Sequence, residues 1–252
     1  MSNSPHDSRR SRWSSLLLNR VIQRATCSCL LVLVSTVVVS AQANDTSSSS
    51  AATSAAQSSR ASTASTEGIQ KRWNEFGFWG GISFDATTLI GKTPDAKFGN
   101  IGLRYGRVLA ASKTVAFEWT IDAIPLSILS NNRFTAVPNG TGSFTVTQTR
   151  KSVYGWGLAP IGLKFNFRRN RRVQPFGQAT GGFLYFNEQV PLAGAARFNF
   201  TFDFSGGVQV VNSNRRAFTI GYKYQHISNG YRANFNPGVD LQMVFVGFSV
   251  FK

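Results

Sequence analysis

Three polar residues near the end of the chain have the types and spacing of a hydrolase triad. His226 and Ser228 lie two positions apart in the stretch QHISNG (225–230), and Asp240 follows the stretch NPGV (236–239). A serine hydroxyl attacks an ester when a base takes its proton, and a catalytic histidine needs a third group to fix its tautomer. An amide N–H of Asn229 would stabilise the resulting oxyanion. The set predicts nucleophilic catalysis by an activated serine.

The same residues also admit a structural interpretation. His226 would then be a polar residue at a membrane interface, and Ser228, Asn229 and Gly230 would form a turn. Asp240 would only begin a strand. Spacing alone leaves both interpretations open.

The elements that must position these residues are predicted β-strands. From Trp73 onward, apolar residues recur at every second position, as in Phe198, Phe200, Phe202 and Phe204. This period places alternate side chains on opposite faces of a strand. Eight strands are predicted, at 74–86, 98–109, 113–125, 152–167, 173–187, 197–211, 216–229 and 240–251.

Strand and loop lengths predict an all-β fold, an eight-stranded antiparallel up-and-down transmembrane β-barrel of the outer membrane. Most of the strands are longer than the roughly five or six residues of soluble sheets and suit a tilted membrane-spanning strand. Long connections alternate with short ones, as external loops alternate with periplasmic turns in such barrels. The apolar register shifts at Ala159-Pro160, which predicts a bulge. The long connections are 87–97, 126–151, 188–196 and 230–239, and the short ones are 110–112, 168–172 and 212–215.

The two faces of the predicted strands differ in polarity. An eight-stranded barrel is only wide enough for side chains to fill its interior, so we expect a plugged barrel and no diffusion pore. A soluble lipocalin-like barrel is the alternative, and it would turn the apolar face inward. The charged residues opposite the apolar face are Arg104, Glu118, Asp122, Lys164, Asp203 and Lys223.

This pattern places the candidate triad on the outside of the barrel. His226 and Ser228 continue the apolar face that carries Phe218 and Ile220, so they are expected to point toward the bilayer at the external end. The next loop is a hairpin, which would bring Asp240 back beside His226.

The N-terminal segment predicts export. Five arginines precede the apolar run 30–39, and the small residues of SAQA (40–43) predict signal-peptide cleavage after Ala43. Residues 44–72 are rich in Ser and Ala and predict a disordered tether, followed by the barrel at 73–252. His6, Cys27 and Cys29 leave with residues 1–43, which excludes a disulfide scaffold, a Cys-ligated metal and a Cys nucleophile.

The charge is strongly basic, yet its distribution does not suit nucleic acid. The net charge of +16 becomes +12 when the export segment removes five Arg and one Asp. The densest basic run, 168–172, falls in a predicted turn and not along a helix, so we expect no nucleic-acid partner. The sequence has no glycine-rich phosphate loop and no His/carboxylate metal cluster, so we expect no metal and no cofactor.

The segment from His226 to Asp240 resembles a known family. His-x-Ser-Asn, followed by Asn-Pro-Gly and an acidic residue in the last two strands of an eight-stranded barrel, is similar to the lipid A 3-O-deacylase (PagL-type) family. Members hydrolyse the acyl ester at the 3-position of lipid A with a Ser-His-Glu triad and an Asn-assisted oxyanion hole. The resemblance covers 73–252 in outline, and 226–240 is its specific part.

The resemblance implies a role for each matching residue. Ser228 would be the nucleophile, His226 the general base and then acid, and Asn229 the oxyanion donor. Asp240 would stand where the family has Glu, and because Asp is one methylene shorter it reaches His226 only if the strands shift slightly. Gly230 also replaces an Ala that many relatives carry.

The resemblance also implies the substrate and the location. We expect lipid A of lipopolysaccharide as substrate, with Arg232 and Asn236 as substrate-binding residues, in the outer membrane and as a monomer or weak homodimer. A non-catalytic small barrel with a structural or surface-binding role is the alternative function. Some cations in or beside the external loops are expected to pair with lipid A phosphates, and for each one taken alone a solvated loop charge is the favoured alternative. These cations are Lys92, Lys97, Arg133, Arg150, Lys151, Arg197 and Arg232.

Overall fold

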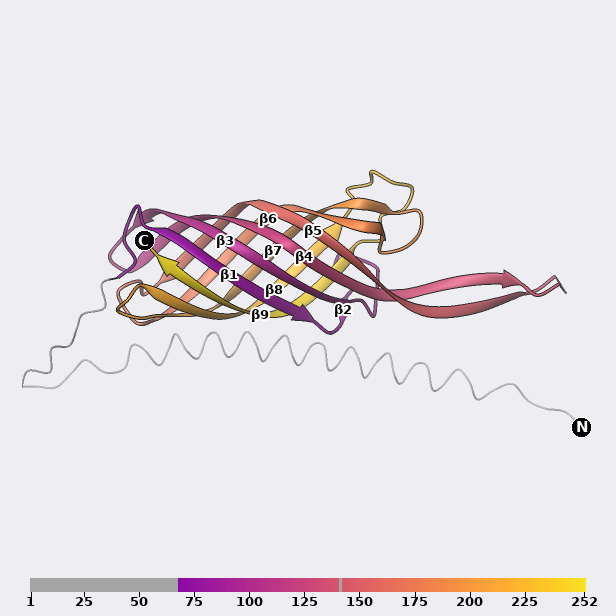
Figure 1. Cartoon of the computed structure of the whole chain (residues 1–252), viewed down its shortest axis with the longest axis horizontal. Coiled ribbons are helices and arrows are strands. Elements are labelled where there is room, and N and C mark those ends of the chain that lie inside the picture. Colours follow the sequence, from indigo (N-terminus) through magenta and orange to yellow (C-terminus); the bar gives the residue numbers. More distant parts are fainter. Residues whose placement is uncertain (1–67, 141) are drawn as a thin grey trace, which may run out of the picture. The chain divides into compact units, whose positions relative to one another are not determined.

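A computed structural model of the chain describes residues 68–140 and 142–252, and they form nine β-strands (Figure 1). The predicted signal peptide and most of the predicted tether lie outside the described residues. No helix among the described residues is long and apolar enough to cross a membrane. The strands are β1 (Asn74–Ser83), β2 (Ala86–Thr87), β3 (Lys97–Ala111), β4 (Val115–Pro138), β5 (Phe144–Phe167), β6 (Val173–Val190), β7 (Ala196–Val211), β8 (Arg216–Ser228) and β9 (Val239–Phe251).

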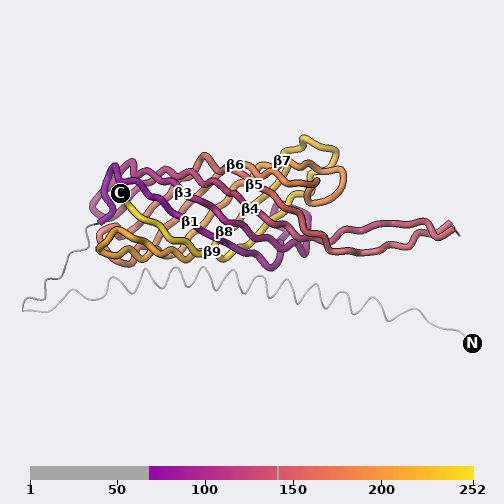
Figure 2. Tube along the Cα trace, in the orientation of Figure 1, coloured from indigo at the N-terminus to yellow at the C-terminus, as the bar shows by residue number. Residues whose placement is uncertain are grey.

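The eight long strands close into a ring. Each pairs antiparallel with its neighbour in the order β1-β3-β4-β5-β6-β7-β8-β9, and β1 also pairs with β9. Figure 2 shows the resulting wall of slanted strands. The two-residue strand β2 pairs antiparallel with the start of β9, where Thr87 lies opposite Asp240. The predicted fold, an eight-stranded up-and-down barrel, is confirmed.

The apolar face of the strands forms the outer wall. Phe200, Phe202 and Phe204 are exposed along β7, whereas Thr201 and Asp203 between them are buried inside. The same alternation runs along β9, where Val244 and Val246 are exposed and Phe245 is buried. An exposed apolar belt with a polar interior is the reverse of a soluble barrel and suits a lipid environment.

Ion pairs and apolar side chains fill the interior. Lys164 Nζ lies 2.9 Å from Glu75 Oε2 and 3.5 Å from Glu118 Oε2, and all three residues are buried. Arg104 binds Asp122 through two hydrogen bonds of 2.7 and 2.8 Å. Lys223 Nζ lies 3.3 Å from Asp203 Oδ2, so the six charged residues expected inside the barrel are paired there. Buried apolar clusters fill the interior toward each end.

Two predicted boundaries are wrong. The long loop predicted at 126–151 is mostly strand, because β4 and β5 continue as a paired ribbon to Pro138 and Phe144. Residues 68–72, assigned to the tether, pack against the barrel: Ile69 is fully buried and its N–H donates to Arg169 O at 3.3 Å. The predicted bulge is present, because the β5–β6 register shifts between Leu158 and Ile161.

Candidate active site

Neighbouring positions on β8 and β9 bring the predicted base and acid together. His226 lies directly opposite Asp240 in the antiparallel register, so their side chains share one face of the sheet. His226 Nδ1 lies 2.6 Å from Asp240 Oδ1, and both side chains are buried. The shorter side chain of Asp240 therefore reaches His226 across the directly paired strand positions.

The second oxygen of Asp240 is held by backbone donors from the segment between β2 and β3. The N–H groups of Ile90 and Gly91 donate to Asp240 Oδ2 at 2.5 and 2.9 Å. Lys92 N–H then donates to Pro237 O at 2.6 Å, and Thr93 Oγ1 donates to Gly238 O at 2.7 Å. Residues 90–93 and 237–240 therefore clamp each other. These hydrogen bonds favour the ionised carboxylate.

The imidazole of His226 lies on the outer wall of the barrel, where Phe202 and Gly238 pack against it. Its ring centroid is 5.1 Å from that of Phe202 on β7, a residue of the lipid-facing set. Gly238 crosses its edge with a φ of 63°, and a Cβ there would lie 3.1 Å from His226 Cε1. Because Nδ1 faces the carboxylate, Nε2 is the nitrogen left to accept a proton from a nucleophile.

Ser228 is the last residue of β8 and lies on the same strand face as His226. It is half-buried and pairs with Phe200 on β7. Within the described residues, no hydrogen bond joins Ser228 to His226. Catalytic hydrogen bonds are often long in free enzymes and tighten when substrate binds.

Asn229 is buried and tied to the external loop that follows it. Its backbone N–H donates to Asn236 Oδ1 at 2.9 Å, and its side-chain Nδ2 donates to Phe235 O at 2.6 Å. Nδ2 carries a second hydrogen, which can serve an oxyanion. Asn236, for which substrate binding stays a prediction, therefore fixes the position of Asn229 through its side-chain oxygen.

Arg232 closes the turn that begins at Asn229. Its N–H donates to Asn229 O at 3.2 Å, and Tyr231 before it has a φ of 60°. The exposed guanidinium of Arg232 lies 5.5 Å from the Phe198 ring and 5.8 Å from the Phe200 ring. These contacts bring its charge to the outer wall next to Ser228, which pairs with Phe200.

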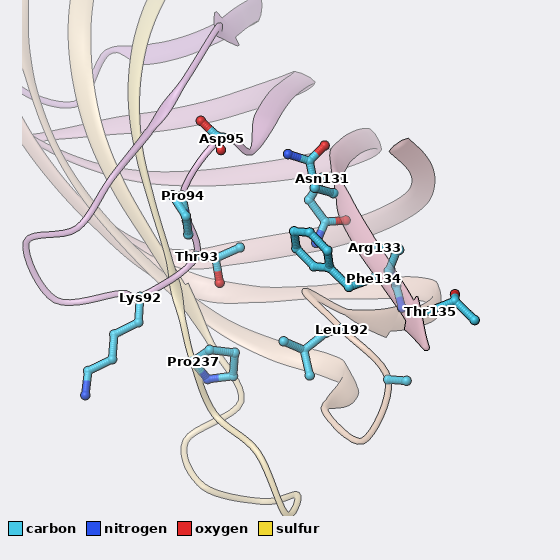
Figure 3. Close-up of a pocket in the computed structure, with 12 residues that line it drawn as sticks. Lys92, Thr93, Pro94, Asp95, Asn131, Arg133, Phe134, Thr135, Leu192 and Pro237 are labelled. Carbon is cyan, nitrogen blue, oxygen red and sulfur yellow. The ribbon is translucent and has the colours of Figure 1, made fainter. Parts of the chain in front are cut away.

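A hollow of about 510 Å³ lies beside the clamp that holds Asp240 (Figure 3). Lys92, Thr93 and Pro237 line one side of it. Asn131 and Arg133 on β4 line another. Lys92, Thr93 and Pro237 therefore belong both to the lining of the hollow and to the clamp that holds Asp240.

Comparison with known proteins finds a match to one family model and similarity to several solved structures of outer-membrane proteins. A family model described as lipid A 3-O-deacylase (PagL) matches residues 101–249, which include the whole candidate triad. No curated protein sequence matches. The solved structure of the outer membrane enzyme PagL is similar with a TM-score of 0.50 and 14% identity, covering 68% of this chain and 97% of that one.

Two further solved structures have lower scores. Neisserial surface protein A (NspA) gives a TM-score of 0.40 and 14% identity, covering 71% of this chain and 96% of that one. Ail, the attachment invasion locus protein of Yersinia pestis, gives 0.37 and 12%, covering 73% of this chain and 100% of that one.

Proposed function

The chain belongs to the lipid A 3-O-deacylase (PagL) family of outer-membrane barrels, and from this premise we propose that it is a serine esterase acting through Ser228, His226 and Asp240. It removes the ester-linked acyl chain at the 3-position of lipid A. The observation that carries the proposal is the 2.6 Å contact between His226 Nδ1 and Asp240 Oδ1 on the outer wall of the barrel.

The reaction proceeds in two steps. Ser228 Oγ attacks the ester carbonyl while His226 Nε2 takes its proton, and the charge of Asp240 stabilises the imidazolium. The tetrahedral oxyanion accepts a hydrogen bond from Asn229 Nδ2. The intermediate collapses to an acyl-serine as the ester C–O bond breaks, and the imidazolium of His226 protonates the departing 3-oxygen of the sugar, which leaves as a hydroxyl. Water, deprotonated by His226, then hydrolyses the acyl-serine and releases the fatty acid.

The position of the triad supports a lipid substrate. Exposed Phe200 and Phe202 flank it on β7, so an acyl chain can lie against the wall while its ester reaches Ser228. Arg232 offers a cation at the same level, and Arg133 borders the hollow behind the clamp. Guanidinium groups at these places suit the phosphates of lipid A.

Asp240 in place of the family's Glu is compatible with this mechanism. The shorter side chain still contacts His226, and two backbone N–H groups fix its other oxygen. Orientation by the third member of a triad requires such a fixed carboxylate.

Mass spectrometry of lipid A tests the proposal. Purified lipid A in detergent is incubated with the refolded full chain and, in parallel, with Ser228→Ala. The proposal expects loss of one hydroxyacyl chain with the wild type alone. An unchanged lipid A mass with a folded wild-type barrel, or equal loss with Ser228→Ala, would refute it.

A further inference from the structure

The end of the barrel opposite Ser228 carries only basic charge. The short turns, the segment before β1 and the end of β9 meet there, because Ile69 N–H donates to Arg169 O and Phe251 N–H donates to Arg215 O. Arg169 N–H in turn donates to Thr114 O. The segments 68–74, 107–115, 167–173, 211–217 and 251–252 thus form one rim, here called the basic rim.

The basic rim contains eleven Lys and Arg and no Asp or Glu. The external segments at 84–97, 130–152, 187–198 and 229–240 mix seven cations with four acids. The asymmetry is therefore a property of one end and not of the whole chain. The cations of the basic rim are Lys71, Arg72, Arg107, Lys113, Arg168, Arg169, Arg171, Arg172, Arg215, Arg216 and Lys252.

Three of these cations have structural contacts. Arg107 Nη1 donates to Asn74 Oδ1 at 2.7 Å, Arg169 Nη1 donates to Ile69 O at 2.8 Å, and Arg215 lies 4.2 Å from the Trp73 ring. The other eight are exposed, and none forms an ion pair with any described residue. Their side chains also donate no hydrogen bond to another described residue, so their charged groups are free to meet a ligand.

The exposed cations border the apolar belt directly. Phe167 precedes Arg168, Val173 follows Arg172, and Phe218 lies two residues after Arg216, and all three apolar side chains are exposed on the outer wall. Long basic side chains at the edge of such a belt lie at the level of lipid headgroups. Lys and Arg side chains near an anionic lipid surface are attracted to it.

We propose that the basic rim binds anionic phospholipid headgroups of the leaflet at the turn end of the barrel. The ligand chemistry is a phosphodiester with net negative charge, as in phosphatidylglycerol. The candidate triad meets the opposite leaflet, so the two ends of the barrel recognise different lipids. That the basic rim meets the inner leaflet of the outer membrane rests on the proposed function, whereas its preference for anionic over neutral lipid does not.

Spin-labelled lipids test the proposal on the full chain in phosphatidylcholine vesicles. Electron paramagnetic resonance gives the fraction of labelled lipid that the barrel immobilises, for phosphatidylglycerol and for phosphatidylcholine. We expect phosphatidylglycerol to associate about threefold more strongly. The preference should fall toward one in about 1 M salt, where charges are screened within roughly 3 Å.

Two matched variants locate the effect. One replaces Arg168, Arg171, Arg172 and Arg216 by Gln, and the control replaces Lys97, Arg150, Lys151 and Arg197 at the other end by Gln. The rim variant should lose most of the preference and the control should keep it. Equal association of both lipids with the wild type, or equal loss in both variants, would overturn the proposal.

A polymeric partner would give a different result. Binding of the wild type to purified peptidoglycan through the same arginines, without selection of phosphatidylglycerol, would also overturn the lipid assignment. None of these readouts measures hydrolysis, so a failure of the proposed enzymatic function leaves the test intact.

Discussion

The carboxylate of Asp240 has two tasks at the scale of single residues. Oδ1 contacts His226 Nδ1, and Oδ2 accepts hydrogen bonds from Ile90 and Gly91. Removing its charge while keeping its shape should therefore affect catalysis more than folding.

Asp240→Asn should lower kcat for lipid A hydrolysis by about 10³- to 10⁴-fold, because an amide stabilises the wrong tautomer and no longer balances the imidazolium. Release of the hydroxy fatty acid measures kcat. Asp85→Asn is the control and should retain activity. The Asp85 carboxylate lies in an external segment and accepts a hydrogen bond from the N–H of the next residue, Ala86. A kcat for Asp240→Asn within tenfold of the wild type would remove Asp240 from the mechanism.

The sequence predicts this contact only in part. The hairpin between His226 and Asp240 follows from strand alternation and from the turn residues of 229–238, so the pairing of base and acid was predictable. The donors of Ile90 and Gly91 were not, because backbone N–H groups leave no side-chain signature. The bonds that occupy Asn229 were also missed, since they depend on the conformation of the following loop.

At the scale of elements, the clamp between residues 90–93 and 237–240 is the feature that positions the site. Gly91 lies against the loop before β9 so closely that a Cβ would be 2.8 Å from Gly238 C and Val239 N. These are backbone atoms and cannot turn aside. The site therefore depends on a glycine that carries no catalytic group.

Gly91→Ala should lower kcat by about tenfold or more, because moving the loop displaces Asp240 and His226 by enough to misalign the reacting groups. The barrel itself should remain folded, as judged by heat-modifiable gel mobility. Gly177→Ala, where an added Cβ meets nothing within 4 Å, is the matched control and should retain full activity. Wild-type kcat in Gly91→Ala would show that the clamp does not position the acid.

The ribbon formed by the outer parts of β4 and β5 shows where the prediction of elements fails. Residues 134–138 and 144–152 are exposed on both faces, so no sustained apolar alternation is needed there, and only Phe144 and Val146 show it. Gly140 and Gly142 take φ values of 80° and 76° in the turn that joins them. Inside the belt one face is lipid-exposed and the other packed, and there the alternation predicts every strand.

At the scale of the whole molecule, the charged groups inside the barrel are paired with one another. Lys164 is buried between Glu75 and Glu118 and also donates to Gln209 Oε1 at 2.9 Å. Because the charged residues alternate with the apolar face in the sequence, their inward orientation and mutual pairing could be predicted. Which acid pairs with which base could not, because it depends on the stagger of the strands around the ring.

Lys164→Met should lower the free energy of unfolding by about 3–5 kcal/mol, because it leaves two buried carboxylates without a cation. Urea unfolding in detergent micelles measures the change. Lys151→Met breaks an ion pair with Glu188 in which both side chains are more than 40% exposed, and should cost less than about 1 kcal/mol. Equal losses in the two variants would contradict a stabilising role for the interior network.

Covalent labelling of Ser228 tests whether the three residues on the outer wall act as one nucleophilic unit. A lipophilic fluorophosphonate is incubated with the folded barrel, and peptide mass spectrometry locates the adduct. We predict modification at Ser228 in the wild type, and its slowing by orders of magnitude in His226→Ala, because the serine hydroxyl then lacks its base. Modification of another residue, or labelling of Ser228 at the same rate without His226, would contradict the account.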